Sequence, residues 1–266
     1  MVFPLLKANL KANWVVGLII LLVMFMYFTV LSSMFDPESL EGLIAMLEAM
    51  PKELIAAMGF DNFGDTYTTY MANSYYNFIA ILFPMIYIIV VGNRLIAKHI
   101  DSGSMAYLLS TPNSRLKIII TQAFYFLASI TLIFFIVTVY GIIISEIFLP
   151  GHLEIFSFIL LNIVTMFTFY ALSGIVFFFS AIASDTKQSL SFGAGIPIAF
   201  FVINMLANVG EKTEFLKYFT IFTLLNPQEI VEGSSFTIIA ISILLIIAVA
   251  FYLAAIWLFN KRNLAV

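Results

Sequence analysis

The chain of 266 residues is 62% hydrophobic and only 10% charged, its formal net charge is −3, and its mean hydropathy is +1.08. Soluble domains contain about 45–50% apolar and about 25% charged residues, so this composition excludes a soluble globular enzyme and a disordered chain, and it requires a lipid bilayer as solvent. The absence of cysteine excludes disulfides and cysteine nucleophiles, and two histidines are too few for a histidine-rich metal site.

The first element in chain order is a predicted interfacial helix at residues 3–14. Its apolar residues recur at helical spacing, and its lysines lie beside the apolar stripe, where long side chains reach the lipid headgroups. A frayed start to the first membrane span is the alternative. The stripe consists of Phe3, Leu6, Leu10 and Trp14, with Lys7 and Lys11 beside it.

Six apolar segments are long enough to cross the membrane, since a spanning helix needs about 20 apolar residues. None carries a charge at its centre, and the apolar runs are continuous rather than alternating, which argues against a β-barrel. The predicted fold class is therefore an all-α polytopic membrane protein, with residues 1–266 as a single transmembrane domain. The spans cover about residues 14–35, 74–96, 118–146, 155–183, 190–208 and 236–260. The fifth is the weakest prediction, because it is short and contains two glycines and a proline, which membrane bundles tolerate.

Two longer connections lie on the predicted outer side. Residues 36–73 have the pattern of two amphipathic helices, predicted to form an outer helical hairpin that is either functional or a structural cap. In residues 209–235, four aromatic residues recur at helical spacing, which is typical of a membrane-interface anchor. A role in the exit of a cargo is the alternative for these residues, which are Phe215, Tyr218, Phe219 and Phe222.

The distribution of charge predicts the orientation of the spans. If both termini and two short loops share one side, that side has a net charge of +7 and the other side −10. Basic loops remain in the cytoplasm, so we expect a multi-pass protein of the plasma membrane with both termini cytoplasmic. The basic residues on that side are Lys7, Lys11, Arg94, Lys98, Arg115, Lys117, Lys187, Lys261 and Arg262.

The predicted cytoplasmic loop, residues 97–117, contains a short amphipathic helix over 104–110. Ser102 or Ser104 is expected to cap it, and Thr111 before a proline ends it. Such a helix docks its apolar face on a soluble partner or lies on the inner leaflet. Met105, Leu108 and Leu109 form that face, and Ser114 is predicted to cap the third span.

This loop resembles the acidic-x-Gly-Thr…Leu-Leu-Ser-x-Pro-x-x-Arg loop of the permeases of type-2 ABC (ATP-binding cassette) transporters. Asp101 stands where glutamate is usual, and Ser104 where threonine is usual. The matching residues are Asp101, Gly103, Ser104, Leu108, Leu109, Ser110, Pro112 and Arg115. The number of spans, the amphipathic start and the ending Leu258–Leu264 also resemble the family, although Asn263 replaces a frequent aspartate.

The resemblance implies that this loop, Met105 included, is the coupling helix that binds a cytosolic ABC ATPase. The chain lacks the Gly-x-x-x-x-Gly-Lys-Ser/Thr phosphate cradle, so we expect it to be no enzyme by itself and to bind no cofactor or metal. ATP and Mg²⁺ are expected in the partner. The implied assembly has two ATPase subunits and two permease chains, with a homodimer expected, surrounded by membrane lipid and without nucleic acid.

Six neutral polar residues are candidates for burial among the predicted spans, with Asn73 and Ser173 among them, and the other four are candidates for a substrate path. Hydrogen bonding between helices is the default explanation for them, and contact with a cargo is the alternative. The family resemblance implies an exporter, and a path lined mostly by Phe, Met and Leu with a few amides suits a hydrophobic or amphipathic cargo, such as a peptide, an antibiotic or a lipid-like molecule. The alternative is a non-transporting membrane scaffold or sensor that uses the acidic outer hairpin. The four residues are Asn77, Gln122, Asn162 and Asn204.

Overall fold

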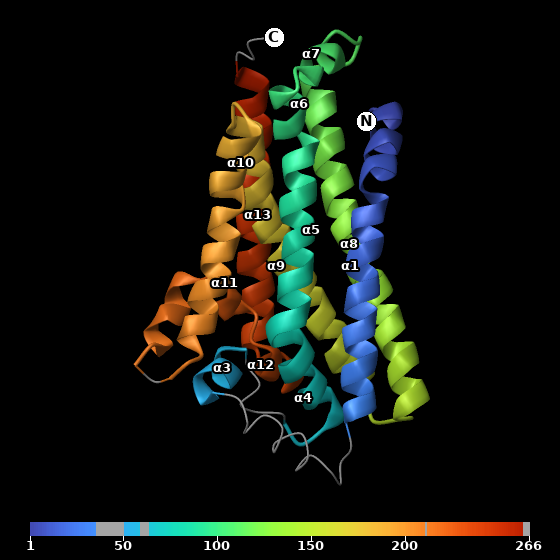
Figure 1. Ribbon diagram of the computed structural model, residues 1–266, viewed down its shortest axis with the longest axis vertical. Helices are drawn as coiled ribbons and strands as arrows, with labels where there is room; N and C mark the ends of the chain where they lie inside the picture. The colour runs from blue at the N-terminus through green and yellow to red at the C-terminus, as the bar shows by residue number, and fades with distance from the viewer. Residues whose placement is uncertain (36–50, 59–63, 211, 263–266) are drawn as a thin grey trace.

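The computed structural model describes residues 1–35, 51–58, 64–210 and 212–262 (Figure 1). Within these ranges every regular element is a helix, and six helical stretches are long and apolar enough to cross a membrane. This confirms the predicted all-α polytopic membrane fold. The predicted first helix of the outer hairpin falls in residues 36–50, outside the described ranges.

The membrane-length stretches follow the predicted order. They are α1 (Phe3–Met34), α4 (Tyr67–Met71) continued by the π-helix η1 (Ala72–Ile79) and α5 (Ala80–Leu95), α8 (Arg115–Phe148), α9 (Ile155–Ile182), α10 (Thr186–Gly193) with α11 (Gly195–Ala207), and α13 (Phe236–Lys261). The connections contain α3 (Lys52–Ala57), α6 (Ala97–Asp101), α7 (Ser104–Leu109), the 3₁₀-helices η2 (Glu214–Phe219) and η3 (Ile221–Leu224), and α12 (Pro227–Val231).

The predicted interfacial segment and the first span form one continuous helix, α1, rather than two elements. The predicted apolar stripe and the lysines beside it lie on its exposed side. Leu10 and Trp14 are exposed on the outside of the bundle, whereas Asn9 and Asn13 are buried against it. The start of α1 is thus helical and not frayed.

The second span begins earlier than its apolar run, because a capping box starts α4. Thr66 Oγ1 accepts a hydrogen bond from Thr69 N, and the Thr69 side chain accepts one from Thr66 N. The helix then continues through the polar residues of η1 into α5. The fifth span is broken at Ala194 into α10 and α11, next to the glycines that made its prediction weak.

Residues 209–235 do not form the α-helix that the aromatic spacing predicts. Two 3₁₀-helices occur instead, separated by Thr220 in an extended conformation. Phe215, Tyr218 and Phe219 are exposed, while Phe222 is buried. The predicted stripe of four is therefore wrong as a single face, because the break at Thr220 turns Phe222 inward.

The interior is centred on α9, which packs against α5, α8, α10 and α13. Next to it lies a cluster of aromatic rings in edge-to-face contact, the geometry that ring quadrupoles favour. The ring centroids of Phe28 and Phe158 are 5.9 Å apart, and those of Phe28 and Tyr75 are 5.2 Å apart. Gly141 of α8 allows this close approach: a Cβ at that position would lie 2.5 Å from Phe158 Cζ and 3.0 Å from Phe28 Cζ.

We therefore expect Gly141→Ala to destabilise the bundle by about 1–3 kcal/mol, because both rings are fully buried and cannot move aside without repacking. The measurement is the thermal unfolding midpoint of the purified protein in detergent. Gly195→Ala is the matched control, since a Cβ there would meet no atom within 4 Å. An equal shift for both variants would contradict the packing explanation.

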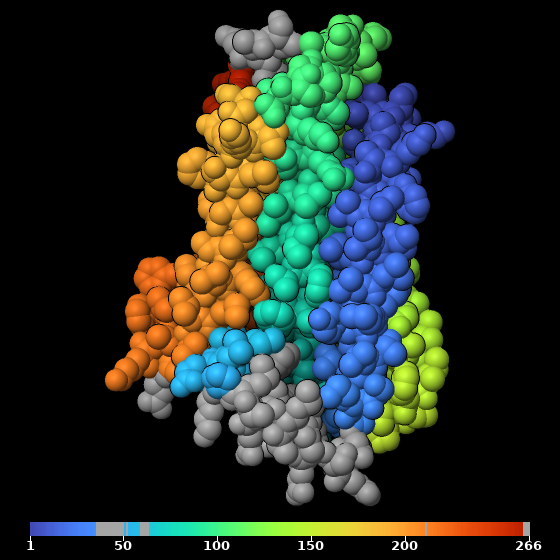
Figure 2. Space-filling model, in the orientation of Figure 1, coloured from blue at the N-terminus to red at the C-terminus, as the bar shows by residue number. Residues whose placement is uncertain are grey.

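The bundle has two distinct ends (Figures 1 and 2). The start of α1, the end of α13, α6 and α7 lie at one end, and α3, α4 and α12 lie at the other. We call them the α7 end and the α12 end. The segments that carry the nine basic residues of the predicted cytoplasmic side all meet at the α7 end.

Candidate functional site

The α7 end contains the loop that sequence analysis identified. Gly103 precedes α7 with φ +70°, in the left-handed region that glycine adopts at no steric cost. The predicted serine cap is wrong, since neither Ser102 nor Ser104 caps α7. Their hydroxyls instead hydrogen-bond each other at 2.9 Å, and Ser104 Oγ also lies 2.9 Å from His99 Nδ1. These hydrogen bonds fix the conformation of the turn that joins α6 to α7.

The apolar face of α7 is turned toward the bundle. Met105 is buried in the core, and Leu108 and Leu109 are half-buried against it. The large side chain that projects from α7 is Tyr107, which is 79% exposed. The sequence-based prediction did not include Tyr107, because it considered only the apolar face of the helix and Tyr107 lies on the opposite face.

The remaining loop residues divide into exposed and anchored groups. Arg115 is anchored: its Nη1 donates to the carbonyl oxygen of Arg262 at 2.8 Å. Arg262 in turn donates to the carbonyl oxygens of Ala181 and Ala183, at 3.2 and 2.7 Å. The start of α8 is thus tied to the ends of α13 and α9. The exposed group consists of Asp101, Gly103, Ser110 and Pro112.

A one-residue break joins the loop to the second span. Ile96, with φ −132° and ψ −62°, separates α5 from α6. Gln122 of α8, only 1% exposed, donates to the carbonyl oxygen of Leu95 at 2.8 Å and accepts a hydrogen bond from the Asn9 amide of α1. On the other side of the break, Ala97 N donates to Ser180 Oγ of α9 at 3.1 Å. Three neighbouring helices therefore hold this junction.

The four polar residues predicted inside the spans do not share one site. Gln122 belongs to the junction just described. Asn162 is buried in α9, where its amide donates to the Phe158 carbonyl oxygen at 2.9 Å. Asn77 and Asn204 lie together on one cavity at the α12 end. The structure thus brings together two of the four.

That cavity has a volume of about 640 Å³ and lies between η1, α11 and the segment that includes η3 and α12. Its wall combines side-chain amides with apolar residues. The amide-bearing residues are Asn73, Asn77, Asn204, Asn208, Asn226 and Gln228, and the apolar residues are Ile81, Phe222, Leu225, Pro227 and Phe236. We call it the amide-lined cavity. The sequence indicated Asn73, Asn77 and Asn204 as buried candidates but not Asn208, Asn226 and Gln228, because these three lie at the end of an apolar run or beyond it.

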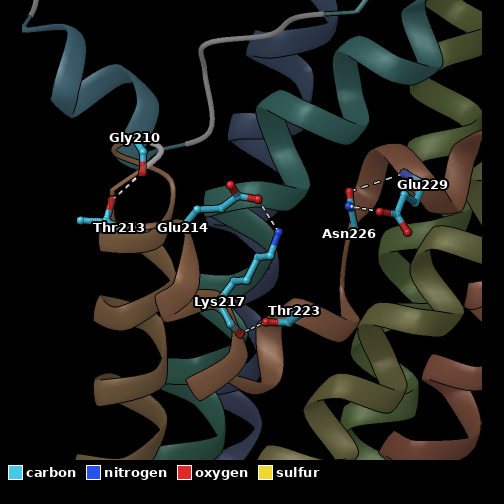
Figure 3. Close-up of polar contacts among 7 residues, drawn as sticks. All are labelled: Gly210, Thr213, Glu214, Lys217, Thr223, Asn226 and Glu229. Atoms are coloured by element: carbon cyan, nitrogen blue, oxygen red, sulfur yellow. Dashed lines mark hydrogen bonds and ion pairs between the residues drawn. The ribbon is translucent and has the colours of Figure 1, made fainter.

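Two charged side chains line this cavity, Lys217 and Glu229, and each has a polar partner (Figure 3). Lys217 Nζ lies 2.5 Å from Glu214 Oε1. This hydrogen bond lowers the pKa of the Glu214 carboxyl and raises the pKa of the Lys217 amine, so both remain charged and paired near neutral pH. Asn226 Nδ2 donates to Glu229 Oε1 at 2.8 Å, and Thr223 Oγ1 donates to the Lys217 carbonyl oxygen.

Asn73 is the most deeply placed amide of the cavity. It is 5% exposed, whereas Asn204 is half-buried. Each amide supplies donors and an acceptor without charge. The cavity is therefore suited to a ligand with uncharged polar groups and an apolar part.

The family model described as ABC-2 family transporter protein matches residues 6–264, which is nearly the whole chain. No match was found among curated proteins.

Proposed function

Because the chain belongs to the family of ABC-2 transporter proteins, whose permeases work with an ABC ATPase, we propose that it is the permease of an ATP-driven exporter. The proposed assembly contains two copies of this chain and two ATPase subunits in the plasma membrane. The positive charge of the α7 end supports a cytoplasmic position for both termini. The observation that carries the proposal is α7 itself, a short helix held between two membrane spans with an exposed tyrosine.

The proposed mechanism follows from how α7 is connected. Through α6 it continues into α5, and through the Ser114-capped start of α8 it continues into the third span. When the ATPase dimer closes, it would push on α7, and the attached helices α5 and α8 would then move as rigid bodies. The 34 residues of α8 extend about 50 Å, enough to carry the motion across the bilayer. On the other span, η1 carries Asn73 and Asn77 of the amide-lined cavity.

The proposed cargo is hydrophobic or amphipathic and uncharged where it contacts the cavity. The mixed wall of amides, phenylalanines and aliphatic side chains supports a peptide, an antibiotic or a lipid-like molecule. Among the described residues that line the cavity, the cation Lys217 is paired with Glu214, so no free cation attracts an anionic cargo.

We expect Asn204→Leu to lower the affinity for such a cargo about fivefold, because one hydrogen bond contributes about 1 kcal/mol. Binding of a labelled uncharged hydrophobic peptide to the purified complex measures this. Met205→Leu, on the adjacent position of α11 and outside the cavity lining, is the control. If both variants bind the peptide equally well, the cavity is not part of the cargo path.

The proposal as a whole is tested by reconstitution. The chain is co-purified with an ABC ATPase from the same cells, placed in liposomes, and assayed for ATP hydrolysis stimulated by hydrophobic peptides and for their accumulation. Stimulation with accumulation supports the exporter. A stable complex that neither responds to any compound nor transports one would favour the scaffold or sensor instead.

A further inference from the structure

A second cavity, of about 440 Å³, opens at the α7 end between the second and fifth spans. Figure 2 shows α5 and α10 side by side on one face of the bundle, and the two helices are in contact. The lining of this cavity is apolar at one end and polar at the other. Ile89, Val90 and Leu190 form an apolar wall, and Asn93, Arg94, Lys98, Asp101, Ser102 and Thr186 form the polar part toward the α7 end. We call it the α5–α10 groove.

The polar part of the groove has an excess of positive charge. Arg94 and Lys98 line it together with the single carboxylate of Asp101, and within the described part of the chain neither cation forms an ion pair. Arg94 Nη1 donates a hydrogen bond of 3.4 Å to Asn13 Oδ1. Lys98 is exposed. An excess of one positive charge at the edge of an apolar wall attracts an anion that is itself joined to an apolar chain.

A buried acceptor lies beside these cations. Asn93 is 9% exposed, and among the described residues its Oδ1 has no hydrogen-bond partner. Since a buried polar atom without a partner is costly, a ligand that donates a hydrogen bond here would be favoured. The hydroxyls of Ser102 and Thr186 add donors for an anion.

We propose that the α5–α10 groove binds one anionic phospholipid with a hydroxyl-bearing headgroup. Its phosphodiester contacts Lys98 and Arg94, an acyl chain lies along Ile89, Val90 and Leu190, and a headgroup hydroxyl donates to Asn93. Basic pockets between spans on the cytoplasmic side favour such headgroups, and each cation near the surface contributes about 1 kcal/mol. The bound lipid lies directly beside the α5–α6 junction and stabilises its conformation.

The test is a lipid titration of the purified full-length chain, followed by native mass spectrometry. Phosphatidylglycerol, phosphatidylcholine and inorganic phosphate are the three probes. We expect phosphatidylglycerol to bind in preference to phosphatidylcholine, and inorganic phosphate to fail to displace it, because phosphate lacks the acyl chain. Lys98→Gln is expected to lower the affinity for phosphatidylglycerol about fivefold, which is the loss of one cation.

Two further variants separate this site from general attraction to the membrane. Lys117→Gln removes a charge at the same end of the bundle but outside the groove, and we expect no change in bound phosphatidylglycerol. Val90→Trp fills the apolar part without changing charge, and we expect loss of the lipid. The proposal is overturned if Lys117→Gln matches Lys98→Gln, if Val90→Trp retains the lipid, if phosphatidylcholine binds equally well, or if inorganic phosphate displaces the lipid.

Discussion

Replacing Tyr107 with aspartate is expected to weaken binding of the ATPase by at least about 30-fold. Tyrosine is enriched among the residues that dominate protein interfaces, where truncation costs about 2 kcal/mol or more. Tyr107 is the most exposed of the large apolar side chains on the predicted coupling helix. Aspartate at this position would also place a charge without a partner in the contact. The affinity of the permease in nanodiscs for the purified ATPase measures the effect.

Two comparisons make this expectation specific. Tyr107→Phe keeps the ring and is expected to retain most of the affinity. Leu108→Asp is expected to lower the thermal unfolding midpoint as well as the affinity, because Leu108 packs against the core. Tyr107→Asp should leave the unfolding midpoint unchanged. Assembly of Tyr107→Asp with undiminished affinity would show that the ATPase does not bind this face of α7.

Gln122→Met is expected to separate ATP hydrolysis from transport. Methionine has a similar size but cannot donate to the Leu95 carbonyl oxygen or accept from Asn9. Leaving a buried donor or acceptor unsatisfied costs about 1–3 kcal/mol, so the α5–α6 junction should lose its fixed geometry. A push on α7 would then bend the junction instead of moving α5. We expect transport per ATP hydrolysed to fall about tenfold, as measured in the reconstituted complex.

The control for Gln122→Met is Thr138→Ala on the same helix. The Thr138 hydroxyl donates to the Phe134 carbonyl oxygen of its own helix, at 2.7 Å. Its removal is expected to leave both transport and hydrolysis near the unmodified values. Equal coupling in Gln122→Met and the unmodified protein would mean that the junction is held by Ser180 and the surrounding packing alone.

The six spans were predictable because a crossing helix needs a fixed length of apolar sequence, and that requirement is visible without a structure. The third and sixth spans match α8 and α13 to within a few residues. The cap of α8 was predictable too, and it is confirmed: Ser114 Oγ accepts a hydrogen bond from Lys117 N at 3.2 Å. These features depend on residues close together in the chain.

Features that depend on tertiary contacts were not predictable in this way. The helix of the second span includes Asn73 and its polar neighbours because other helices bury them, which hydropathy does not register. The face that α7 turns outward depends on the core beneath Met105. Asn77 and Asn204, 127 residues apart, share a cavity while Gln122 and Asn162 do not, and no spacing in the sequence distinguishes the two pairs.

The π-helical stretch Ala72–Ile79 sets the rotation of the start of the second span. A π-turn holds one residue more than an α-turn, so the helix before it is rotated about its own axis by about 100° relative to an uninterrupted α-helix. This rotation determines which neighbours the residues at the start of the span meet. The presence of Asn73 on the lining of the amide-lined cavity is therefore a consequence of the π-helix and not of α-helical spacing.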